Sequence, residues 1–135
     1  MAIVPNEDQF RELMESTDAG PVTMLNLLKF KPQAEGATGT GAEAYARYSA
    51  EAMRMVEARG GRLAWAGRAD QILIGDPAED WDLIALVEYP SRKAFIDMVT
   101  SAEYLETHAH REAGTERTIL VACTPLSGGG GLPRS

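Results

Sequence analysis

A few polar side chains in this sequence are of types that could hold or transform a small molecule. Asn26 lies within the apolar run MLNLLKF, where a buried amide without partners would cost about 1–3 kcal/mol. In a dry cavity such an amide could orient a ligand oxygen by hydrogen bonding. The alternative is a structural amide that bonds a loop or a second subunit, and the sequence leaves both interpretations open.

Trp65 and Tyr48 are the aromatic candidates for a pocket. Trp65 precedes Gly67 by two positions on a predicted strand, so the glycine leaves room beside the indole on that face. Core packing is the alternative for this ring. Tyr48 belongs to the apolar stripe of a predicted helix, and a role as general acid would require a substrate proton within about 3 Å of its hydroxyl.

His108, His110 and Arg111 lie close together in the sequence and are candidates for acid–base chemistry or ligand binding. On a helix, residues two apart point in nearly opposite directions, so the two histidines cannot hold one metal ion, and each has a glutamate as its i,i+4 neighbour, Glu112 or Glu106. We therefore expect no metal centre. A single histidine suffices as an acid or base, or as an axial heme ligand, and Arg111 could bind a substrate carboxylate or simply be solvated.

Composition excludes several classes of function. The 135 residues fit one domain, with 44% hydrophobic and 24% charged residues and a formal net charge of -7. No Lys/Arg cluster is present, which argues against a nucleic acid or an anionic membrane as partner. No apolar run approaches the ~20 residues that span a bilayer, and the start of the chain does not read as a signal peptide. With one cysteine, Cys123, these features predict a cytoplasmic protein.

Hydrophobic periodicity predicts the elements that must position these side chains. It divides the chain into an N-terminal helical extension at residues 1–21, a main domain at 22–125 and a flexible tail at 126–135. We expect helices over 8–17, 45–59, 94–102 and 103–110, a loop over 32–43, and strands over 22–31, 62–68 with a continuation at 71–74, 81–89 and 118–124. No hydrolase signature, phosphate loop or zinc motif appears, so no cofactor is expected.

The main domain therefore has the order strand, helix, strand, strand, helix, strand, which is typical of the ferredoxin-like βαββαβ fold. This fold is α+β, with an antiparallel four-stranded sheet and helices on one face. The predicted strands are nevertheless apolar at both parities, as in LIALV at 83–87 and ILVA at 119–122. Because two crossover helices cover one face only, the pattern predicts that a second copy covers the other, in a homodimer through the sheet face.

Several segments together resemble a known family: MLNLLKF, AYARY, GRADQILIG, WDLIALVEYPSRKAFIDMV and HREAG. In this order they are similar to the longer members of domain-of-unknown-function family 1330. The resemblance implies a dimeric α/β barrel with enclosed pockets and no established activity. Its superfamily includes cofactor-independent monooxygenases and heme-degrading monooxygenases. By analogy with the heme-degrading group, Asn26, Trp65 and either His108 or His110 would form a site, although Trp65 falls on the second strand rather than the third.

These observations predict a small dimeric protein with a pocket for a small organic molecule. Oxygenation or isomerisation without a cofactor is the expected chemistry. Two alternatives remain open, namely a non-catalytic dimer that binds a small ligand and a heme-binding or heme-degrading protein. The pocket candidates are Asn26, Tyr48, Trp65, His108, His110 and Arg111.

Overall fold

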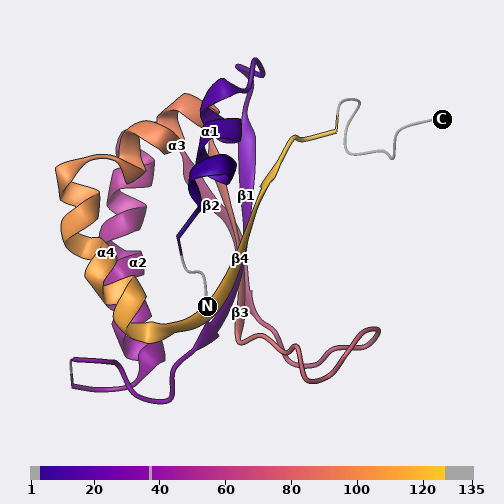
Figure 1. The fold of residues 1–135 in the computed structure, drawn as a ribbon, viewed down its shortest axis with the longest axis vertical. Helices are drawn as coiled ribbons and strands as arrows, with labels where there is room; N and C mark the ends of the chain where they lie inside the picture. Colours follow the sequence, from indigo (N-terminus) through magenta and orange to yellow (C-terminus); the bar gives the residue numbers. More distant parts are fainter. Residues whose placement is uncertain (1–3, 37, 127–135) are drawn as a thin grey trace.

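Four helices lie on one side of a four-stranded sheet in the computed structural model (Figure 1). The structure describes residues 4–36 and 38–126. In chain order the elements are α1 (Glu7–Glu15), β1 (Val22–Phe30), α2 (Gly41–Ala58), β2 (Arg62–Arg68), β3 (Leu83–Tyr89), α3 (Arg92–Val99), α4 (Ala102–Gly114) and β4 (Thr115–Cys123).

Each helix begins at a polar residue whose side chain accepts a hydrogen bond from a backbone N–H of the first turn. These caps are Asn6, Thr40, Ser91 and Ser101, and the first two form capping boxes with Gln9 and Glu43. Ser101 divides the helical region after β3 into α3 and α4. Across the described residues, no helix is long and apolar enough to cross a membrane.

The sheet has the order β2-β3-β1-β4, and all three pairings are antiparallel. This arrangement confirms the predicted ferredoxin-like fold, with the helices segregated to one face. The register places Asn26 of β1 between Ala85 of β3 and Leu120 of β4, at the centre of the sheet. Side chains opposite one another in neighbouring strands share a face, so this register decides which residues surround the site.

Several boundaries differ from the sequence-based expectation: α2 begins at residue 41 instead of 45, β3 begins at 83 instead of 81, and α4 ends at 114 instead of 110. The strand expected at 71–74 is wrong, because these residues belong to an irregular connection between β2 and β3. The backbone N–H of Ala69 donates to the carbonyl of Asp82 at 3.0 Å, which closes the connection at its base and leaves the residues between outside the ladder. The last strand begins at Thr115 instead of residue 118.

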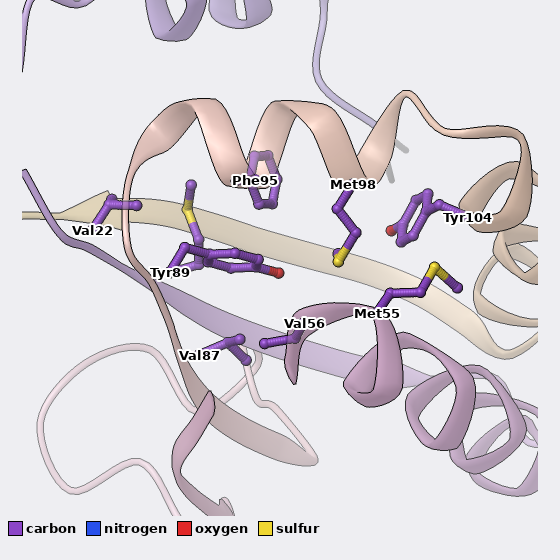
Figure 2. Packing of buried hydrophobic residues seen from close by; sticks show 9 residues of the cluster. Val22, Met55, Val56, Val87, Tyr89, Phe95, Met98 and Tyr104 are labelled. Atoms are coloured by element: carbon purple, nitrogen blue, oxygen red, sulfur yellow. The ribbon is translucent and has the colours of Figure 1, made fainter. Parts of the chain in front are cut away.

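The helix-facing side of the sheet carries the core. Figure 2 shows side chains from α2 and α3 meeting those of β1 and β3, and the cluster comprises Val22, Met24, Met55, Val56, Val87, Tyr89, Phe95, Met98 and Tyr104. On the opposite face, which we call the open face, none of the described helices lies over the sheet (Figure 1). The apolar residues of this face stay partly or largely exposed: Leu25, Leu27, Trp65, Ile84, Leu86, Ile119 and Val121.

Two glycines allow α2 and α4 to approach the end of β1 closely. A Cβ on Gly41 would lie 2.1 Å from the carbonyl oxygen of Lys31, and a Cβ on Gly114 would lie 2.3 Å from the carbonyl oxygen of Gly41. The backbone N–H of Gly41 donates to Lys31, and that of Lys31 donates to Gly114. Only glycine fits at this crossing, so the end of α4 is joined to the start of α2.

Candidate functional site

A cavity of about 810 Å³ lies between the sheet and the helices. Most of its wall is apolar, including Met24, Ala52, Met53, Val56, Phe95 and Met98. The short helix α1 contributes Phe10 and Leu13. Polar residues also line the cavity, among them Asn26, Tyr45, Tyr48, Tyr104, His108 and Arg111. An apolar cavity with a few converging polar groups is the usual form of a small-molecule site.

Asn26 points to the helix side and lines this cavity. It shares strand parity with Met24 and Leu28, both of which are buried against the helices. Its Nδ2 donates to the carbonyl of Met24 at 3.2 Å and, at 3.4 Å, to that of Ala85. Among the described residues no donor reaches its Oδ1. The amide is therefore anchored through its nitrogen and presents an acceptor oxygen at the cavity.

Tyr48 of α2 and Tyr104 of α4 meet through their hydroxyl groups, which lie 2.8 Å apart. Their rings are also packed edge to face, with centroids separated by 5.9 Å. Two hydroxyl groups carry two hydrogens, and their mutual bond uses one. The other hydrogen remains able to donate to a ligand oxygen.

Burial raises the pKa of each tyrosine around the cavity. The pKa of Tyr45 rises to about 12, and that of Tyr48 lies well above its usual value, because the charged phenolate would lose its hydration. The pKa of Tyr104 is raised for the same reason. Arg111 opposes this shift in all three residues, so its positive charge acts on all three hydroxyls. These tyrosines are therefore hydrogen-bond donors at neutral pH.

Arg111 is a buried cation at this cavity, with only 7% of its surface exposed. It lies on α4 one helical turn after Thr107 and lines the cavity beside His108. A guanidinium has five N–H donors, so it can hold a ligand oxygen together with another partner. Its position favours a ligand that is negatively charged, or one that becomes negatively charged during a reaction.

His108 and Glu112 form a hydrogen-bonded pair on α4. The Nδ1 of the imidazole lies 2.8 Å from Oε1 of the carboxylate, and the histidine side chain is 14% exposed. A carboxylate accepts hydrogen bonds, so in the neutral ring Nδ1 holds the hydrogen and Nε2 holds the lone pair. The ring of His108 also packs against Tyr104, with centroids 5.7 Å apart. This arrangement can accept a proton at Nε2.

Two of the six candidates lie outside the cavity lining. Trp65 pairs with Leu86, whereas Leu63 pairs with Val87, so Ala64 is the extra residue of a bulge. The bulge turns Trp65 to the open face, where its ring covers Gly67. The cavity wall does not include His110 either. The structure thus brings Asn26, Tyr48, His108 and Arg111 together, and separates Trp65 and His110 from them.

Sequence reasoning missed two contributors to this group. Tyr104 is 56 residues from its hydroxyl partner Tyr48, and no local sequence pattern predicts a contact between them. Glu112 was visible as the i,i+4 neighbour of His108, but only as a possible metal ligand. Within the part of the chain that the structure describes, no cluster of three or more His, Cys, Asp or Glu could hold a metal ion.

The comparisons with known proteins agree with this fold. The model of the family described as "Domain of unknown function (DUF1330)" matches residues 37–124. RPA0582, a protein of unknown function from Rhodopseudomonas palustris, is 36% identical over 93% of this chain and 98% of its own, with a TM-score of 0.88. No curated protein matches the chain.

More distant structures show the fold alone. SnoaB, a cofactor-independent oxygenase from Streptomyces nogalater, is 14% identical over 82% of this chain and 97% of its own, with a TM-score of 0.54. A putative antibiotic biosynthesis monooxygenase from Caulobacter crescentus is also 14% identical, over 78% of this chain and 89% of its own, with a TM-score of 0.55.

The fold and the site define a ferredoxin-like α+β protein with a cavity between its sheet and its helices. The chain belongs to the DUF1330 family.

Proposed function

We propose that the protein binds a small organic molecule in the helix-side cavity and moves a proton of that molecule through His108. The observation that carries this proposal is the pair formed by His108 and Glu112. Because Glu112 fixes Nδ1 as the donor, Nε2 is the basic atom of the neutral ring. A positioned histidine of this kind acts as a general base.

The rest of the cavity suits the charge that such a step creates. Removal of a proton from a carbon next to a carbonyl leaves the electron pair on the ligand as an enolate. Arg111 would attract the enolate oxygen, and the spare hydrogen of the Tyr48–Tyr104 pair would bond it. Donors fixed in advance in a dry site stabilise such an oxyanion more than water does.

Two net reactions follow from the same enolate. Return of the proton from His108 to a different carbon completes an isomerisation. Alternatively, a methylene group that has lost its proton reacts with molecular oxygen, which oxidises it to a carbonyl and leaves its second oxygen atom as water. Neither reaction requires a bound cofactor. SnoaB is described as a cofactor-independent oxygenase, which supports chemistry of this kind for the fold.

A second candidate function is binding without turnover. The cavity wall contains Met24, Met53 and Met98, and methionine side chains adapt to ligands of different shape. A ligand retained through purification and unchanged afterwards, detected by native mass spectrometry, would favour this function over catalysis.

We also infer that a second copy of the chain covers the open face. Leu25, Leu27, Ile84 and Leu86 form an apolar centre on that face, and within residues 4–36 and 38–126 no helix buries it. A twofold arrangement of the same face on two copies would remove these side chains from water. Size-exclusion chromatography with light scattering should give a dimer at micromolar concentration, and a monomer would contradict this inference.

Deuterium exchange of a carbon acid tests proton transfer before the natural substrate is known. We choose 4-acetylbenzoate, because its carboxylate can pair with Arg111 and its methyl ketone has removable protons. In D₂O, proton NMR should show that the protein accelerates loss of the methyl signal above the buffer rate. His108→Gln should reduce this acceleration by about 100-fold or more, since a general base is worth that much.

His110→Gln is the matched control, because it removes the neighbouring histidine that lies outside the cavity wall. This variant should keep the full acceleration. A wild-type protein that binds the probe, as judged by its chemical-shift changes, and yet exchanges it no faster than buffer would contradict proton transfer. Failure to bind the probe at millimolar concentration would contradict the proposal that Arg111 binds a carboxylate in the cavity.

A further inference from the structure

The connection between β2 and β3 projects away from the sheet. We call residues 69–82 the β2–β3 arm, and Figure 1 shows it extending on the side opposite the helices. Near its tip are two adjacent apolar residues, Leu73, which is 83% exposed, and Ile74, which is 94% exposed. A pair of nearly bare aliphatic side chains on a projecting segment is typical of an interaction site rather than of an ordinary surface.

The base of the β2–β3 arm is held firmly. Asp82 is the centre of this base: its backbone N–H donates to the carbonyl of Leu28 at 2.8 Å, and its carboxylate accepts from the backbone N–H of Phe30 at 2.8 Å. Lys29 pairs with the carboxylate of Asp80 at 2.9 Å. These bonds connect the arm to β1, one of the two interior strands of the sheet.

A second set of contacts connects the arm to β4. Arg117 donates to the backbone carbonyl and, at 3.1 Å, to the carboxylate of Asp80. Its guanidinium also lies 4.4 Å from the centre of the Trp81 ring. An arm fixed at its base by two strands presents its tip in a defined direction, which lowers the entropy lost when the tip binds a partner.

The arm and the open face lie on the same side of the same molecule. The face offers apolar side chains that include Trp65, which is 53% exposed, Leu86 and Val121. In a twofold dimer, the projection of one protomer contacts the patch of the other, and symmetry repeats the same contact in the opposite direction. A second copy therefore accounts for both exposed features at once.

The charges near the tip argue against a membrane as the occupant. Asp70, Asp76, Glu79 and Asp80 belong to the arm, whereas Arg68 at its start pairs with Asp70. Anionic lipid surfaces attract basic segments and repel acidic ones. An apolar tip with acidic neighbours suits an apolar protein surface better than a lipid headgroup layer.

We propose that Leu73 and Ile74 of each protomer pack on the open sheet face of the second copy, so that each β2–β3 arm extends across the dimer interface. This inference rests on the sheet-face dimer proposed above and adds the segment that completes it. It is independent of the ligand in the cavity.

Photo-crosslinking tests the contact directly. With p-benzoylphenylalanine in place of Ile74, irradiation should give a covalent dimer, and mixing light and ¹⁵N-labelled protein should show that the link joins two chains. Mass spectrometry should map it to peptides of β1, β2, β3 or β4. The matched control places the same residue at Met14, a half-exposed side chain of α1 on the helix side, and should give no dimer.

Substitution of the two tip residues by charged ones measures how much the tip contributes to the affinity of the dimer. Leu73→Asp with Ile74→Asp should raise the dissociation constant of the dimer at least tenfold in sedimentation experiments, whereas Met14→Asp should leave it unchanged. An unchanged constant in the double variant, or a crosslink confined to one chain, would overturn the role of the arm while leaving the dimer intact. A monomeric wild type would overturn both, and binding to vesicles containing one-third anionic lipid would assign the tip to a membrane.

Discussion

Nδ1 of His108 lies 2.8 Å from Oε1 of Glu112, one helical turn further along α4. Both residues therefore depend on the same rigid element for their relative position, and no long-range folding event is needed to align them. The helix simultaneously brings Tyr104 beneath the imidazole, since residues four apart share a face. The orientation of the proposed base is thus a local property of α4.

Glu112→Gln should slow deuterium exchange of 4-acetylbenzoate by about 10-fold or more without changing its dissociation constant. The amide can still reach Nδ1, but its NH₂ group allows the opposite tautomer, in which Nε2 carries the hydrogen and is no longer basic. Exchange rates and NMR titrations measure the two effects separately. Glu106→Gln, which alters the glutamate four residues before His110, should match the wild type, and equal rates in both variants would contradict the role of Glu112.

Asn26→Leu should change the free energy of unfolding by no more than about 1 kcal/mol. The amide makes only one well-placed bond, to the carbonyl of Met24, and its oxygen lacks a described partner. Urea unfolding measures this change. Leu28→Ala is the contrasting control, because Leu28 is fully buried two positions along the same face, and we expect a loss of about 2–5 kcal/mol. A comparable loss for Asn26→Leu would identify a structural network instead of a ligand contact.

All four tyrosines, Tyr45, Tyr48, Tyr89 and Tyr104, should resist ionisation in the folded protein. Burial raises the pKa of each, to about 12 for Tyr45. The folded values exceed the unfolded value near 10, so the stability that each burial contributes is complete below about pH 10 and is lost as the pH rises through the folded pKa, which is about 12 for Tyr45. Absorbance at 295 nm should therefore show little tyrosinate at pH 10 in folded protein and about half-ionisation in urea. Identical titration curves for the folded and the urea-unfolded protein would contradict the burial of these tyrosines.

Gly41→Ala should destabilise the protein by about 1–3 kcal/mol, because the added methyl group meets the backbone of Lys31 and Gly114, which cannot move aside as a side chain would. Thermal or urea unfolding provides the measurement. Ala42→Ser, at the exposed next position of the same helix, should stay within about 0.5 kcal/mol of the wild type. A neutral Gly41→Ala would show that the two helices can separate at this crossing.

Periodicity predicted most of the fold, because each element has a strong apolar stripe or run and a recognisable cap or stop. The prediction failed in the run QILI at 71–74, whose aliphatic residues resemble a strand. In the structure no described strand pairs with these residues, and Leu73 and Ile74 are exposed on the β2–β3 arm. An apolar run therefore predicts a strand only where a neighbouring strand can pair with it.

The site was harder to predict than the fold. The parity of β1 is ambiguous because both faces of the strand are apolar, so only the register decides that Asn26 faces the helices. Trp65 illustrates a second difficulty, since one extra residue at Ala64 reverses the face of every later side chain in β2. The contact between Tyr48 and Tyr104 depends on how two helices pack, which local sequence does not encode.

The alternation of β1 has a practical consequence. Met24 and Asn26 face the cavity, whereas Leu25 and Leu27, which alternate with them, face the open side, so one strand forms the wall between two separate surfaces. In the proposed dimer, a ligand can therefore occupy the cavity on the helix side while two copies stay joined through the open face. Substrate preference and subunit affinity can then be altered by substitutions on alternate residues of a single strand, each with little direct effect on the other property.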